Sequence, residues 1–237
     1  MRGIAVMVIA ALGLLGGPAD AGPKKSSDKG TTKQCSGSGA KKKCRRIAVF
    51  SGANAPRSTL RTEPLERPTG ELWLRAENLD QEVKVNIYKQ DGSFDDASLA
   101  KLDDLFRCTK TGEVRAVNAQ LYEQLSRLYD HFAQRIDMVS GFRFAERDSS
   151  RHFHASAADF RIKGISIYEI KKFAETLDMG NMGLGIYPTG QFVHLDFRAP
   201  GEPSFRWTDW SGHSKAQAKK KSGKPTGRTQ PARKPTS

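Results

Sequence analysis

The chain has 237 residues, of which 39 are Lys or Arg, 26 are Asp or Glu and 37% are hydrophobic. These values predict one soluble globular domain with unstructured appendages rather than two packed domains. The formal net charge of +13 is unevenly spread, because residues 22–46 and 214–237 each carry +8 whereas residues 47–213 carry −3. This argues against a nucleic-acid-binding domain, whose positive charge should lie on its folded surface. We expect no nucleic-acid partner.

The first residues have the pattern of an export signal. Arg2 gives a positively charged start, residues 4–15 form an apolar run that is short for a bilayer span, and an Ala-Asp-Ala sequence ending at Ala21 suits a signal peptidase. We predict a signal peptide over residues 1–21, a periplasmic or secreted protein, and no stable membrane insertion after cleavage. A single membrane anchor is the alternative, although a Gly-Gly-Pro sequence ending at Pro18 would break its helix.

Basic segments flank the part of the chain that can fold. Residues 22–46 and 214–237 hold few apolar side chains, so neither can bury enough surface to offset its ordering entropy. We expect a basic, mostly disordered linker over residues 22–68 and a basic disordered tail over residues 214–237. Both would attract anionic cell-envelope polymers through salt-sensitive electrostatics. Solvated linkers without a specific partner are the alternative.

The three cysteines allow one small disulfide loop. In an oxidising compartment Cys35 and Cys44 could pair, which would leave Cys108, in a predicted helix, as the odd one. Three unpaired thiols remain the alternative.

An α+β pattern occupies the middle of the chain. Apolar residues alternate with polar ones from Leu72 to Ala76 and from Val83 to Ile87, which predicts two strands joined by a turn. Three helices are then predicted from apolar residues at helical spacing and from capping residues. The first contains Leu99, Leu102, Leu105 and Phe106; the second follows Asn118 and contains Leu121, Leu125, Leu128 and Phe132; the third follows the Ser166 and Glu169 capping box and contains Ile167, Ile170, Ala174 and Leu177.

Chemically suggestive residues gather in three later segments with strand character, at residues 138–143, 150–161 and 183–196. If His152 and Asp159 flank a turn that enters one strand, they can converge on one point, and His194 can come from the neighbouring strand. Two neutral imidazoles and one carboxylate suit a divalent metal and leave a coordination position for water. By spacing alone this metal signal is weak, because His and Asp at such separations are common.

Several motifs in a fixed order are more specific than that spacing. Over residues 70–210 the chain resembles the zinc D-Ala-D-Ala carboxypeptidase superfamily, in particular its periplasmic murein endopeptidase K type. The motifs that carry the resemblance are Ser150-x-His152, Ala157-x-Asp159, Gly183-x-Gly185-x-Tyr187 and Phe192-Val193-His194-Leu195-Asp196, with Ser140-Gly141-Phe142-Arg143 before them and Phe205-Arg206-Trp207 after them.

The resemblance implies both a fold and a metal site. It implies an α+β domain over residues 69–213, with a small antiparallel sheet carrying the metal and about three flanking helices, as in hedgehog and D-Ala-D-Ala peptidase domains. It also implies that His152, Asp159 and His194 bind Zn²⁺, with water in the fourth position. Zinc lowers the pKa of such a water to about 7 and makes it able to attack an amide carbonyl.

The proton-transferring residue is open, because Gln191 stands where several relatives carry an acid. Asp196 is the first candidate, since the two-residue strand period puts it on the face of His194. An orienting role for Asp196 is the alternative. His154 is the second candidate, and a surface or loop histidine is its alternative.

Two further residues are candidates for binding the substrate. Arg143 would hold a peptide carboxylate or stabilise the developing oxyanion, with a salt bridge to Asp148 or Glu146 as the alternative. Tyr187 would present its hydroxyl, with a core aromatic role as the alternative. Besides Gln191, a second residue departs from the family pattern, because Ala155 stands where a Gly is usual.

These inferences predict a zinc-dependent peptidoglycan peptidase, either a murein endopeptidase or a carboxypeptidase, that hydrolyses amide bonds of stem peptides or cross-links. The alternative, suggested by Gln191 and Ala155, is an inactive peptidoglycan-binding or sensing protein that keeps the metal site.

Overall fold

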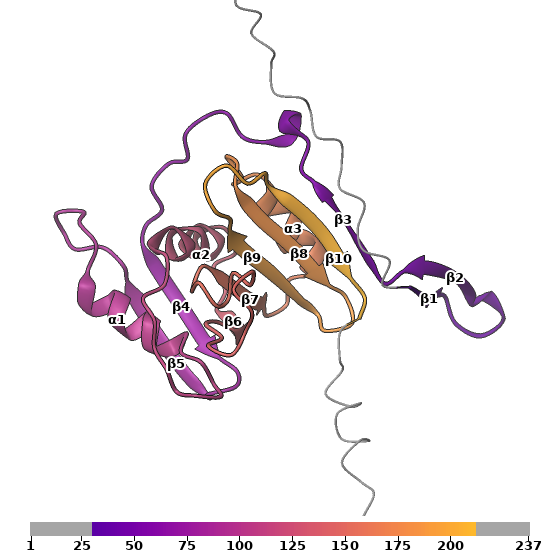
Figure 1. The fold of residues 1–237 in the computed structure, drawn as a ribbon, viewed down its shortest axis with the longest axis horizontal. Coiled ribbons are helices and arrows are strands. Elements are labelled where there is room, and N and C mark those ends of the chain that lie inside the picture. The colour runs from indigo at the N-terminus through magenta and orange to yellow at the C-terminus, as the bar shows by residue number, and fades with distance from the viewer. Residues whose placement is uncertain (1–29, 212–237) are drawn as a thin grey trace, which may run out of the picture.

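A computed structural model describes residues 30–211 of the chain (Figure 1). The predicted signal peptide and the predicted tail at residues 214–237 lie outside the described residues. Among residues 30–211, no helix has the length and apolar character needed to cross a membrane.

Within residues 30–211, ten strands form two sheets. The larger sheet has eight strands in the order β3-β10-β8-β9-β7-β6-β4-β5, and β1 pairs with β2 in a separate hairpin. The strands are β1 (Thr31–Ser36), β2 (Lys43–Ala48), β3 (Phe50–Asn54), β4 (Glu71–Ala76), β5 (Gln81–Asn86), β6 (Ile136–Ser140), β7 (Ala157–Ile162), β8 (Met182–Tyr187), β9 (Phe192–Phe197) and β10 (Phe205–Asp209). Short 3-10 turns occur at Gly39–Lys41 and Arg57–Thr59.

The prediction of a small antiparallel sheet is wrong in size and in direction. Strand β10 runs parallel to β8, and β4 runs parallel to β6, whereas the other neighbours are antiparallel. The sheet is larger than expected because β3 and β10 extend it on one side and the β4–β5 hairpin extends it on the other. Periodicity along the chain identifies strands, but it does not identify their partners.

The three predicted helices are confirmed. They are α1 (Asp96–Leu105), α2 (Ala119–Phe132) and α3 (Ile167–Glu175). The side chains of Asp95, Asn118 and Ser166 cap them by accepting a backbone N–H from the first turn. Each cap satisfies a donor that the helix itself leaves free. The α+β class is therefore confirmed as well.

The helices cover one face of the large sheet. Alternate residues of β7, β8 and β9 join the helices in one apolar core, in which Phe160, Leu184 and Leu195 are fully or almost fully buried. The other residues of the same strands point to the opposite face, as the two-residue period of a strand requires. That opposite face carries Asp159, His194 and Asp196.

The described part of segment 22–68 is ordered, although we expect a mostly disordered linker there. Strand β3, at the edge of the sheet, pairs with β10 along its whole length, and this pairing satisfies the backbone groups of β3 that face β10. Strands β1 and β2 form a hairpin that projects from the body of the protein (Figure 1). A disulfide joins Cys35 to Cys44 across this hairpin, whereas Cys108 is free and buried. The domain boundary at residue 69 stays a prediction.

Candidate metal centre

Two neighbouring strands and one turn bring the three candidate metal ligands together. Asp159 lies on β7 directly opposite His194 on β9, and His152 lies in the turn that precedes β7. One donor atom from each residue can be chosen so that all three lie within 4.8 Å of one another. All three side chains are buried.

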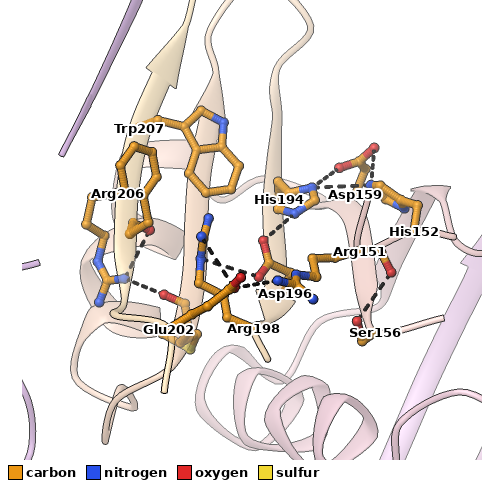
Figure 2. Close-up of polar contacts among 12 residues, drawn as sticks. Arg151, His152, Ser156, Asp159, His194, Asp196, Arg198, Glu202, Arg206 and Trp207 are labelled. Carbon is orange, nitrogen blue, oxygen red and sulfur yellow. Dashed lines mark hydrogen bonds and ion pairs between the residues drawn. The ribbon is translucent and has the colours of Figure 1, made fainter. Parts of the chain in front are cut away.

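The distances show which atoms face the common point (Figure 2). His152 Nε2 lies 3.3 Å from His194 Nδ1 and 3.3 Å from Asp159 Oδ2. His194 Nδ1 lies 2.8 Å from Asp159 Oδ1. The facing atoms are therefore one nitrogen from each ring and the carboxylate between them.

The outer ring nitrogens are held by oxygen acceptors. His152 Nδ1 donates to the carbonyl oxygen of Gly141 at 2.7 Å, and His194 Nε2 donates to Asp196 Oδ2 at 2.9 Å. These oxygens can only accept, so the proton of each neutral imidazole lies on its outer nitrogen and the lone pair faces the centre. Metal-binding histidines are oriented in this way in proteins. The residues present therefore fit a metal ion.

The electrostatics of the cluster favour a negative charge on Asp159 and a positive charge on His194. Burial alone would raise the pKa of Asp159, but His152 and His194 hold that pKa well below its usual value. Burial lowers the pKa of His194, but hydrogen bonds to Asp159 and Asp196 outweigh it and raise this pKa to about 9. A proton on His194 compensates the buried carboxylates, and a cation at the same place would do so too.

Arg143 contacts the metal-ligand candidate Asp159 directly. Its Nη2 forms a close ion pair with Asp159 Oδ2, and its Nε donates to Ser140 Oγ at 2.7 Å. Glu146 lies farther from the guanidinium, at 3.7 Å. Arg143 therefore forms one ion pair with Asp159 inside the candidate metal centre and a longer one with the more exposed Glu146.

The two candidates for proton transfer lie in different surroundings. Asp196 is buried against the outer nitrogen of His194, which is the position expected for an orienting carboxylate. Burial raises the pKa of Asp196, but His194 outweighs this effect and lowers it. His154 is exposed, its Nε2 lies 2.6 Å from the carbonyl oxygen of Asp148, and it does not line the cleft above the centre.

The candidate substrate residue Tyr187 lies at the end of β8 beside this cleft. Its hydroxyl accepts a hydrogen bond from Trp207 Nε1 at 3.1 Å, and its ring stacks on Phe192. Burial raises the pKa of Tyr187 to about 12, so the hydroxyl keeps its proton near neutral pH. The side chain thus packs against Trp207 and Phe192 and also borders the cleft, and its role in substrate binding stays a prediction.

A cleft of about 690 Å³ lies over the candidate metal centre. Besides the residues already named, four charged side chains that the sequence did not single out line its wall: Arg147, Arg151, Arg198 and Glu202. Arg151 forms a close ion pair with Glu202, and Arg198 Nη1 lies 4.0 Å from Glu202. Arg198 continues the two-residue alternation of His194 and Asp196, so a signal for it was present in the sequence. Glu202 lies in a loop and has no comparable signal.

The two departures from the family pattern lie in turns. Ala155 has φ of 49°, in the left-handed region that favours Gly, and it belongs to the turn between His152 and β7. Gln191 lies in the β8–β9 turn, where its side-chain amide donates to the Pro188 carbonyl at 2.5 Å. Gln191 does not line the cleft. Its amide therefore says little about the chemistry of the centre.

Comparisons with known proteins agree with this geometry. Proteins named peptidoglycan L,D-endopeptidase MepK from Escherichia coli K12 and from Shigella flexneri are each 28% identical over 139 residues, which is 53% of this chain and 75% of each relative. A "Probable peptidoglycan L,D-endopeptidase MepK" from Haemophilus influenzae is 31% identical over 118 residues, which is 44% of this chain and 62%, less than two thirds, of that relative. No solved structure matches the chain significantly. The family model described as peptidoglycan L,D-endopeptidase MepK matches residues 68–200, more than half of the chain, and the protein therefore belongs to this family.

Proposed function

We propose that the protein is a zinc-dependent peptidoglycan L,D-endopeptidase that cleaves amide bonds in cross-links between stem peptides. One observation carries the proposal: His152, Asp159 and His194 bring one possible ligand atom each to within 4.8 Å of the others at the base of an open cleft. The names of the relatives support the L,D bond and endopeptidase action over the D,D bond and carboxypeptidase action, which the sequence left open.

His152, Asp159 and His194 would hold the zinc ion through Nε2, one or both carboxylate oxygens and Nδ1. Zinc bound there would activate water and polarise the scissile carbonyl as a Lewis acid. Asp196 and the Gly141 carbonyl keep the two imidazoles in the required tautomers. We assign Asp196 to this orienting role, because its Oδ2 is engaged by His194. We assign His154 a structural role, in which its side chain bonds to the Asp148 carbonyl oxygen.

Arg143 stands between the ligand set and the cleft. Its guanidinium neutralises the oxygen of Asp159 that faces away from His194, and its side chain is about one third exposed toward the cleft. A planar guanidinium can bind a carboxylate or a developing oxyanion with two parallel donors. We therefore propose that Arg143 binds the substrate beside the scissile bond. Tyr187, whose hydroxyl keeps its proton, would offer a further donor at the same rim.

The composition of the β1–β2 hairpin supports the proposal that the protein acts at the cell wall. The β1–β2 hairpin carries six Lys or Arg residues, no acidic residue and a disulfide, which suits an oxidising compartment. We propose that the protein is periplasmic or secreted and that this hairpin, with the predicted basic tail, attracts anionic envelope polymers. Such attraction weakens as salt rises. The predicted signal peptide and the membrane-free mature form belong to the same proposal.

The test uses purified full-length protein without the signal peptide, loaded with zinc. Muropeptides that contain either an L,D or a D,D cross-link are incubated with the wild type and with His152→Ala, and the products are separated by chromatography. We expect cleavage of the L,D cross-link alone, and its loss in His152→Ala. His131→Ala is the matched control, because His131 stacks on Phe173 away from the cleft and should keep full activity.

Two outcomes would overturn the proposal. Cleavage of the D,D cross-link alone would assign the cleft to a different bond. A fully zinc-loaded wild type that binds muropeptides without cleaving either cross-link would support the inactive binding or sensing protein instead.

A further inference from the structure

Two glycines of β8 have no part in the function proposed so far. Gly183 and Gly185 lie on the face of the sheet that carries the metal centre, directly opposite Asp196 and His194 of β9. Neither has the positive φ that makes glycine favourable in turns such as the one at Gly180. Their backbone suits any residue, so a requirement for glycine here would come from space alone.

Gly183 leaves the space that the Asp196 carboxylate occupies. A Cβ atom built on Gly183 would lie 2.1 Å from Asp196 Oδ2 and 2.5 Å from its Cγ and Oδ1. These distances are far below van der Waals contact, and the clash involves a short side chain that is buried and already bonded to His194. Any side chain at position 183 therefore displaces the carboxylate from His194 Nε2.

Gly185 leaves the space for the Trp207 indole. A Cβ atom there would lie 2.1 Å from Trp207 Cε2 and 2.4 Å from Nε1. The indole cannot easily move away, since it is buried and its Nε1 donates to the Tyr187 hydroxyl. The centroid of its ring lies 5.0 Å from that of the His194 ring. Figure 2 draws the two side chains.

We propose that Gly183 and Gly185 are positioning residues for the metal centre. Because neither glycine has a side chain, the Asp196 carboxylate can pack against Gly183 and the Trp207 indole can pack against Gly185. These two groups hold His194 from behind and from the side, so that its Nδ1 faces Asp159 and His152. The inference rests on the proposed function for the identity of the metal, but its geometry concerns the protein alone.

The first test is a double-mutant cycle with zinc affinity as the readout, measured by competition with a chelator. Loss of an outer-shell partner lowers metal affinity about 10- to 100-fold. We expect Gly183→Ala and Asp196→Ala each to weaken zinc binding by that amount, and the double variant to be no worse than Asp196→Ala. We expect the same pattern for Gly185→Ala and Trp207→Ala. The proposal would be overturned if Gly183→Ala lowered zinc affinity equally in the wild type and in the Asp196→Ala variant.

A folding control keeps the test decisive. Leu184→Ala alters the same strand on its opposite, helix-covered face, so it should lower stability without changing zinc affinity. If Gly183→Ala does not fold, the pair Gly183→Ala with Asp196→Ala should fold, because the clash is removed. Failure of that pair to fold, while Asp196→Ala folds, would show that Gly183 serves another purpose and would overturn the proposal.

The second test needs no metal. Hydrogen bonding to Asp196 should protect the Nε2 proton of His194 from exchange, giving a downfield proton NMR signal in the metal-free protein. We expect this signal to disappear in Gly183→Ala and to persist in Leu184→Ala. A wild type that shows the protected signal but binds no zinc would refute the proposed function while leaving the positioning inference intact. An unchanged signal in Gly183→Ala would refute the inference alone.

Discussion

The two faces of β7, β8 and β9 are both buried but contain opposite chemistry. On one face, Leu184, Val193 and Leu195 pack against the helices. On the other, Asp159 and His194 are also buried, although they line the cleft, and every contact described for them involves polar or aromatic groups. Burial of the apolar face stabilises the fold through the hydrophobic effect. Burial of the polar face costs free energy unless each charge is compensated.

This difference teaches how one set of strands provides both stability and reactivity. The apolar face needs only shape and volume, so it tolerates hydrophobic exchange of similar size. The polar face depends on specific atoms, since Asp159 contacts His152, His194 and Arg143 at once. Substitutions on the two faces should therefore separate loss of folding from loss of function.

Asp159→Asn should have the largest effect. The amide cannot supply the negative charge that faces both imidazoles, so zinc affinity should fall by more than the roughly 100-fold expected for an outer-shell partner. Elemental analysis of the purified variant and a muropeptide digest would check this. Retained zinc at one equivalent, with normal turnover, would show that the polar face does not hold the metal.

Leu184→Ala should produce the reverse result on the opposite face. The deleted side chain is fully buried, so the free energy of unfolding should fall by about 2–5 kcal/mol. Urea denaturation of the metal-free protein measures this loss. Zinc affinity should stay within about threefold of the wild type, well below the change for an outer-shell partner. A parallel loss of zinc affinity would mean that the two faces are coupled.

Arg143→Lys should have an intermediate effect. Lysine keeps the charge but loses the fork that contacts Asp159 and Ser140, so the catalytic efficiency should fall about 10- to 100-fold. Steady-state kinetics on an L,D cross-linked muropeptide would measure it. Glu146→Gln, which removes only the more distant partner at 3.7 Å, serves as the matched control and should keep most of the activity.

The stability of the metal-free protein should depend on pH through His194. Its pKa is raised to about 9 in the folded state, against about 6.5 in an unfolded chain. Its stabilising contribution is fully present below about pH 6.5 and is lost as pH rises through about 9. Denaturation between pH 6 and 10 would show the decline. Zinc binds the deprotonated ring, so in excess zinc the decline should disappear.

Ala133→Gly should have the smallest effect. Ala133 ends α2 with φ of 50° and is exposed, so glycine removes backbone strain without creating a cavity. Relief of the left-handed strain stabilises the folded state, whereas glycine raises the entropy of the unfolded chain and so offsets part of that gain. We expect a net stabilisation of a few tenths to about 1 kcal/mol. A thermal melt measures it, and zinc affinity should not change. A destabilised variant would show that the methyl group packs usefully at the end of the helix.

Local sequence signals determined the helices and the alternation of the strands. Asp95, Asn118 and Ser166 each act within one turn of chain, so a helix start can be identified from neighbouring residues alone. The two-residue period likewise put His194 and Asp196 on one face of a strand. The candidate ligands followed from these short-range patterns together with the order of the motifs.

Only the tertiary structure decided which strands are neighbours and which partner each charged group has. Strand β3 pairs with β10 from the far end of the chain. Arg143 contacts Asp159, a partner that the sequence analysis did not name for it, as well as Glu146. The space above Gly183 and Gly185 is likewise defined by side chains of β9 and β10. Such contacts depend on the distance between segments after folding, and periodicity along the chain carries no information about that distance. The sequence by itself thus determined that His194 and Asp196 share one face of their strand, and folding determined what each of them contacts.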